Sequence, residues 1–125
     1  MMNSRAKKII FALALVTAPL QVSALDYADG YDAVWSGDYS KAVELFQLLA
    51  ADGDARAQFN LAMLYHSGNG VQPNEVEAVK WYKRAAEQGV KEAQAYLAVA
   101  FEEGWFGLAR DLTKAEYWYT RLEES

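Results

Sequence analysis

The chain has 125 residues and a formal net charge of −5, which is enough length for one small domain. A hydrophobic content of 53% argues against extensive disorder, and the acidic balance argues against nucleic-acid or anionic-lipid binding, which requires clustered Lys and Arg. The absence of cysteine excludes disulfides, thiolate nucleophiles, the usual zinc sites and a lipidated N-terminal cysteine.

Residues 1–24 have the pattern of a secretory signal peptide. Arg5, Lys7 and Lys8 precede an apolar run over 9–16, and small residues at 22–24 form a cleavage site. The run is shorter than the roughly 20 residues of a membrane span, although an uncleaved N-terminal anchor is the alternative. We predict cleavage after Ala24 and a periplasmic or secreted domain at 25–125. Loss of the three cations would take the net charge from −5 to −8.

Apolar residues at helical spacing predict six helices in the remainder of the chain. The expected ranges are 26–36, 39–51, 55–67, 75–88, 91–103 and 113–123. Glycines and short polar side chains separate them; Asp38, Asn74 and Asp111 can each cap the helix that follows. Thr113 with Glu116 offers a competing capping box for the last helix. The prediction is an all-α protein.

The stretch 55–90 recurs along the chain, which predicts an antiparallel helix-hairpin solenoid. A shift of 36 residues places Ala57, Leu61 and Ala62 on Ala93, Leu97 and Ala98. After one inserted residue between Gly104 and Gly107, a shift of 37 places Ala78, Trp81 and Tyr82 on Ala115, Trp118 and Tyr119. About two and a half units result, at 26–54, 55–90 and 91–125. Since no hairpin can bury its own apolar face, each unit must stack on its neighbours.

The middle unit resembles a Sel1-like repeat, a relative of the tetratricopeptide repeat. The residues that carry the resemblance are Ala57-Gln58, Leu61-Ala62, Tyr65, Gly68-x-Gly70-Val71, Ala78, Trp81-Tyr82 and Ala85-Ala86-Glu87-Gln88-Gly89. The third unit departs from this pattern by its inserted residue and by Leu122-Glu123, and the first unit has a much shorter turn. The resemblance implies a scaffold for protein partners, with the first helix of each unit lining a concave surface.

The inserted turn of the third unit contains Trp105 and Phe106. We expect this pair to fold back against the fifth and sixth helices, with a projecting contact point as the alternative. The last unit has no separate capping helix, so its polar end (123–125) forms a simple cap or its apolar surface supports weak self-association.

No residue pattern indicates catalysis, and we expect no cofactor and no metal. His66 is the only histidine and has no companion at ligand spacing. The pairs Glu75/Glu77, Glu102/Glu103 and Glu123/Glu124 read as solvated helix faces rather than as acid and base across a cleft. The turn at 68–71 lacks the Lys-Ser/Thr of a phosphate-binding loop.

The binding prediction rests on one face of the third and fifth helices. Arg56, Phe59, Met63 and His66 lie at spacings of 3, 4 and 3, away from the residues that repeat. Their equivalents Glu92, Ala95, Val99 and Glu102 differ in chemistry, as expected of a partner-specific surface. Ordinary solvated surface is the alternative. Phe59 and Met63 would form an apolar patch with charged margins, which often marks a partner site.

These observations predict an exported, non-enzymatic module that binds a protein or peptide in the cell envelope. One alternative is a small structural or regulatory subunit of an envelope complex. Another is a hydrolase of cell-wall glycans or β-lactams, by resemblance to cysteine-rich relatives, but no nucleophile or carboxylate pair supports it.

Overall fold

A computed structural model describes residues 26–125, and the predicted signal peptide lies outside them. Six α-helices and no strand occupy the described residues, which confirms the all-α prediction. The helices are α2 (Tyr27–Trp35), α3 (Tyr39–Ala51), α4 (Ala55–Ser67), α5 (Glu75–Glu87), α6 (Lys91–Glu103) and α7 (Leu112–Glu124). None of these helices combines the length and the apolar composition needed to cross a membrane.

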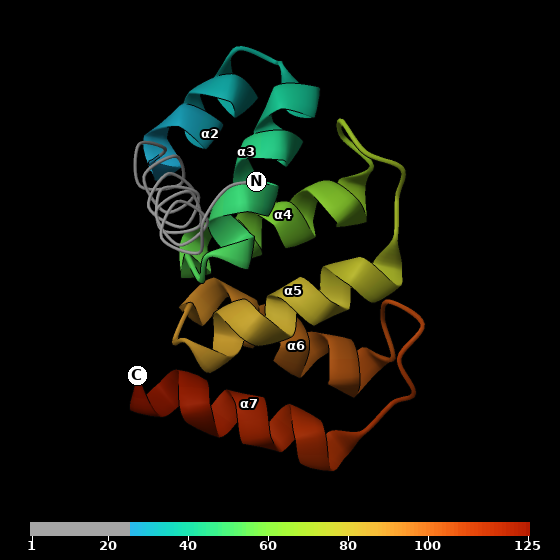
Figure 1. Cartoon of the computed structure of the whole chain (residues 1–125). Helices are drawn as coiled ribbons and strands as arrows, with labels where there is room; N and C mark the ends of the chain where they lie inside the picture. Colours follow the sequence, from blue (N-terminus) through green and yellow to red (C-terminus); the bar gives the residue numbers. More distant parts are fainter. Residues whose placement is uncertain (1–25) are drawn as a thin grey trace, which may run out of the picture.

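The helices form three antiparallel hairpins that stack one below another, from α2–α3 to α6–α7 (Figure 1). Each helix packs on the one that precedes it in the chain, and α2 also contacts α4. The core runs through the stack as small residues at helix crossings with larger side chains between them. Ala42, Ala57, Ala62, Ala78 and Ala98 are fully buried at such positions.

Short polar side chains start five of the six helices. The carboxylates of Asp38 and Asp111 accept hydrogen bonds from Lys41 N at 3.2 Å and Lys114 N at 3.1 Å, and Asn74 caps α5 in the same way. Asp111, not Thr113, therefore caps α7, which begins one residue earlier than predicted. The exception is α6, whose N-cap residue Val90 has no side-chain acceptor.

A buried glutamine fixes each first helix to the hairpin before it. Gln58 Nε2 donates to the Ala50 carbonyl at 3.1 Å, and Gln94 Nε2 donates to the Ala86 carbonyl at 3.0 Å. Both acceptors lie near the C-terminal ends of second helices, where carbonyls have no partner within the helix. This bond gives the Ala-Gln pair of the repeat pattern a structural reason.

The two tryptophans of the repeat occupy equivalent environments. Trp81 is 9% exposed and lies under the Arg84 guanidinium, 4.9 Å from its ring centre; Trp118 is 6% exposed and lies under Arg121 at 5.8 Å. Each cation sits three residues after its tryptophan, on the same side of the helix. The equivalence follows from the repeat and shows that the hairpins are structurally alike.

Backbone hydrogen bonds tie the loops of the second and third units to the first helix of their own hairpin. Asn74 N donates to the Tyr65 carbonyl at 2.9 Å, and the equivalent Asp111 N donates to the Phe101 carbonyl at 2.8 Å. Gly70 has φ of 72° and lies so close to the backbone of Tyr39 that a Cβ would overlap the carbonyl group. Glycine is required there for both its conformation and its size.

The inserted turn reaches further than expected, because Phe106 packs on the preceding unit. Its side chain is 8% exposed and lies against Tyr82 of α5 and His66 of α4. Trp105 instead projects and is 47% exposed. The backbone of Phe106 is left-handed, with φ of 57°, which turns the ring toward the preceding unit. The sequence showed the insertion but not the handedness of the turn.

Removing the hydroxyl should have opposite effects on stability at the equivalent positions Tyr82 and Tyr119. Tyr82 is fully buried and its oxygen has no partner among the described residues, whereas Tyr119 Oη donates to Glu102 at 2.6 Å. An unpaired buried hydroxyl is costly, so Tyr82→Phe should raise the free energy of unfolding by up to about 1 kcal/mol at pH 7. Tyr119→Phe should lower it by about 1 kcal/mol. Urea unfolding followed by circular dichroism measures both.

The pH dependence of stability provides a second test of the Tyr82 assignment. Burial raises the pKa of Tyr82 well above its usual value of 10.0, so on passing pH 10 the unfolded chain loses this proton first. Above pH 10, deprotonation of Tyr82 in the unfolded chain alone therefore lowers the free energy of unfolding, and below pH 10 this loss is absent. Tyr82→Phe should weaken the decline between pH 9 and 11; an unchanged slope would contradict this assignment.

Candidate protein-interaction surface

A cluster of aromatic rings joins the second unit to the third and includes two residues of the predicted binding face. Phe59 of α4, Tyr82 of α5 and Tyr96 of α6 have ring centres 5.3–6.1 Å apart, within the range of favourable aromatic pairs. The ring centre of Phe106 lies 5.8 Å from that of Tyr82, and the His66 ring meets Phe106 edge-on with ring centres 4.6 Å apart. We call these five residues the inter-unit aromatic cluster. Phe59 and His66 thus have packing roles in addition to any role in binding.

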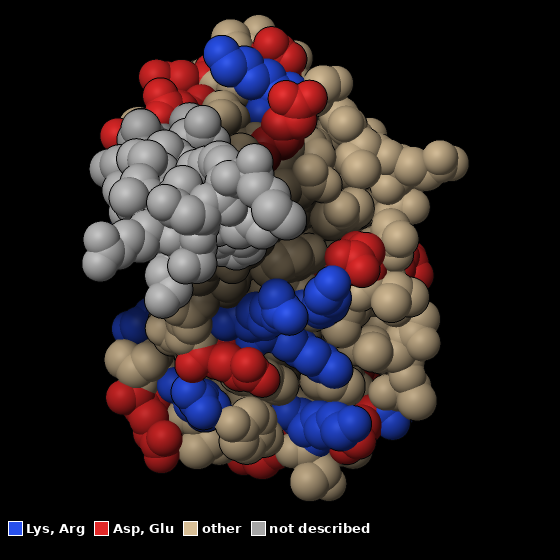
Figure 2. Space-filling view, viewed as in Figure 1, with Lys and Arg blue, Asp and Glu red and all other residues tan. Residues whose placement is uncertain are grey.

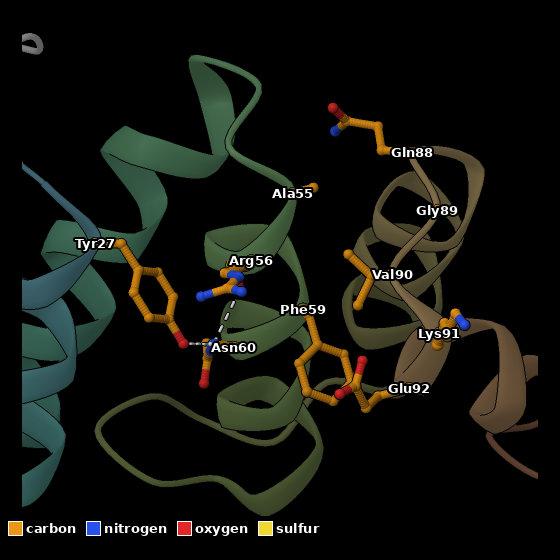
Figure 3. A pocket seen from close by; sticks show the side chains of 10 residues that line it. All are labelled: Tyr27, Ala55, Arg56, Phe59, Asn60, Gln88, Gly89, Val90, Lys91 and Glu92. Carbon is orange, nitrogen blue, oxygen red and sulfur yellow. Dashed lines mark hydrogen bonds between the residues drawn. The ribbon is translucent and has the colours of Figure 1, made fainter. Parts of the chain in front are cut away.

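Beside this cluster, a groove of about 560 Å³ lies between the first helices of the three units. We call it the first-helix groove; its lining comes from α2, from α4 and from the α5–α6 turn with the start of α6 (Figure 3). Its longer lining side chains are those of Tyr27, Arg56, Phe59, Asn60, Gln88, Val90, Lys91 and Glu92. The groove therefore combines apolar side chains with two cations, one carboxylate and two amides.

Hydrogen bonds hold the polar side of the groove in place. Asn60 Nδ2 donates to Tyr27 Oη at 2.8 Å and to the Arg56 carbonyl at 3.0 Å, as Figure 3 shows. The Arg56 guanidinium lies over the Tyr27 ring, 5.9 Å from its centre. Burial raises the pKa of Tyr27, against the opposing effects of the Asn60 bond and of Arg56. Tyr27 therefore stays a neutral phenol and links the first unit to the second.

The seven residues of the predicted face do not form one continuous surface. Arg56, Phe59 and Glu92 line the first-helix groove. His66 lies instead in a separate hollow of about 450 Å³ with Glu75, Trp105 and Phe106. The remaining three positions line neither hollow: Met63 is 40% exposed, Val99 is half-buried, and Glu102 accepts the bond from Tyr119. That the face binds a partner stays a prediction.

The sequence reasoning predicted three of the residues that line the groove and missed the others, among them Tyr27, Asn60 and Val90. Asn60 lies four residues after Arg56, so helical spacing alone could have placed it on the same side of α4. Tyr27 and Val90 reach the groove through the stacking of units, for which the sequence of one helix carries no signal. Within residues 26–125, no three His, Cys, Asp or Glu side chains are grouped as metal ligands.

Comparison with known proteins agrees with the architecture. The Sel1 repeat family model matches residues 27–54, 55–90 and 91–123, which together exceed half of the chain. The chain belongs to the Sel1 repeat family. The structure also resembles a protective antigen of uropathogenic Escherichia coli with an SLR fold, at a TM-score of 0.64 and 41% identity over 69% of this chain and 18% of that one. Both the suspected resemblance and the helical-repeat fold are thereby confirmed.

Among curated Sel1 relatives, the match to rat DAP3-binding cell death enhancer 1 is 44% identical over 51% of this chain and 13% of the relative. The fission yeast chitin synthase regulatory factor 3 is 33% identical over 70% of this chain and 9% of the relative. The chain thus spans only a small part of the curated relatives. The Sel1 repeat is a protein-interaction scaffold, and regulatory names recur among these relatives.

The aromatic cluster predicts that two residues of the candidate face differ in their importance for folding. Phe59→Ala should lower the free energy of unfolding by about 2–3 kcal/mol because the ring supports Tyr82 and Tyr96. Met63→Ala, on the same helix but 40% exposed, should cost less than about 1 kcal/mol. Urea midpoints measure the difference. A loss of stability at Phe59 no larger than that at Met63 would contradict the role given to the Phe59 ring.

Proposed function

We propose that this Sel1 repeat chain is an exported, non-enzymatic adaptor that holds a segment of a partner protein in its first-helix groove. The single observation that carries the proposal is the convergence of Arg56, Phe59 and Glu92 with Tyr27 on one groove between three units. A surface assembled from several stacked units can recognise a longer segment than one hairpin can, which is how solenoid repeats commonly bind.

The chemistry of the groove favours a mixed peptide over a small polar ligand. Phe59 and Val90 offer apolar contacts, while Arg56 and Glu92 can pair with charges of either sign. The Asn60 amide is already oriented by its bonds to Tyr27 and to the Arg56 carbonyl, so its carbonyl oxygen can accept a backbone N–H of the partner without further ordering. A segment with alternating apolar and polar side chains fits this lining.

The groove is tested by photocrosslinking in the native host. A benzophenone amino acid at Asn60 should yield adducts with a defined partner, because that side chain faces the groove. Arg56→Glu should reduce the adduct yield by about tenfold through loss of a central contact. The matched control Arg110→Glu, an exposed loop position, should leave the yield unchanged. Equal adducts from crosslinkers at positions 60 and 110 would contradict a specific groove.

Export is tested separately. The basic start, the apolar run and the small residues at 22–24 lead us to expect a mature N-terminus at Leu25. Intact-mass measurement of the protein purified from the native host, with the periplasmic and secreted fractions analysed apart, gives the answer directly. Purified protein that retains Met1 would refute cleavage and leave the interaction proposal unaffected.

A further inference from the structure

A further hollow, distinct from the first-helix groove and from the hollow at His66, lies between α5 and the α6–α7 loop. Its volume is about 480 Å³, and its apolar lining consists of Val76 and Val79 with Phe106 and Leu108. We call it the α5 pocket. Val76 is 76% exposed, and its equivalents in the other units are the polar Ser40 and Thr113. The pocket is thus a property of the middle unit and not of the repeat in general.

Cations border the α5 pocket. Lys80 and Lys83 contribute to its lining, and Lys and Arg side chains gather over α5 and α7 (Figure 2). Lys80 forms a partly exposed ion pair with Glu77 at 3.4 Å, whereas Lys83 has no carboxylate partner among the described residues. The chemistry that fits this site is a large apolar side chain with a carboxylate beside it.

The first unit of the chain displays this chemistry. Residues 26–54 contain seven acidic side chains and one Lys, and Trp35 at the end of α2 is 76% exposed. Asp32 precedes Trp35 by three residues, so both side chains lie on the same side of the helix. The carboxylates of Asp29 and Asp38 are used in helix caps, but Asp32 forms no side-chain hydrogen bond or ion pair with another described residue.

We propose that the α5 pocket receives Trp35 from a second copy of this chain, with Asp32 of that copy paired to Lys83. The exposed indole would gain contacts with Val76, Val79 and Phe106. Donor and acceptor are different surfaces of one molecule, so the contact is head-to-tail and can repeat to form short open chains. The acidic first unit and the basic margin of the pocket favour this orientation over like-with-like pairing.

Sedimentation velocity of the purified protein tests the proposal. The weight-average sedimentation coefficient should rise with concentration. Trp35→Ala on the donor side and Val76→Glu on the acceptor side should each weaken association by about tenfold or more. Both positions are 76% exposed, so neither change should unfold the protein. The matched controls Tyr117→Ala and Leu112→Glu alter side chains on α7 that are 52% and 59% exposed and should leave association unchanged.

Mixing the two defective variants gives the decisive result. The Trp35→Ala variant keeps the α5 pocket, and the Val76→Glu variant keeps Trp35. An equimolar mixture should therefore form a 1:1 dimer that does not grow further. Wild-type protein that stays monomeric up to about 1 mM would overturn the proposal, as would a mixture that forms no dimer. A monomer that instead binds an acidic peptide through Val76 would also overturn it, by assigning the pocket to another protein. Arg56→Glu should not affect association, which keeps this test separate from that of the first-helix groove.

Discussion

The structure depends on one constraint: the apolar flank of each hairpin stays dry only when the next hairpin covers it. Tyr82 shows this most directly, since its ring is fully buried by Phe59 from its own unit and by Tyr96 and Phe106 from the next. The Gln58 and Gln94 side chains add a hydrogen bond at each junction between units. Apolar contact thus supplies most of the stabilisation between units, and the glutamines fix the register in which the hairpins stack.

The equivalence between α5 and α7 breaks down at two positions that are buried in α5. Val79 and Ala86 of α5 are buried, whereas their equivalents in α7 are Glu116 and Glu123, both exposed. These two carboxylates make this side of α7 more polar than the corresponding side of α5. Elsewhere α7 exposes apolar side chains, since Leu112 is 59% exposed and Tyr117 is 52% exposed.

The sequence predicted the fold more completely than the candidate site. The six helices begin and end within one residue of the predicted bounds, because caps and apolar spacing are local signals. Arg56, Phe59 and Glu92 reach the same groove because they share a helix face in neighbouring units. His66 does not join them, because it lies in the last turn of α4, about 15 Å along the helix from Arg56, where it meets the Phe106 ring. Tyr27 joins the groove only through the stacking of α2 on α4, which the sequence does not record.

The two buried glutamines have unequal surroundings, with a consequence for how the molecule opens. Gln58 Oε1 accepts a hydrogen bond from Gln88 at the end of α5, whereas Gln94 Oε1 has no partner among the described residues. In addition, α5 packs against helices on two sides, and α7 packs principally against α6. Since α7 packs on α6 more extensively than α6 packs on α5, the last two helices should move together as one hairpin. Thermal fluctuations would then part the third hairpin from the second, which would take Glu92 out of the first-helix groove.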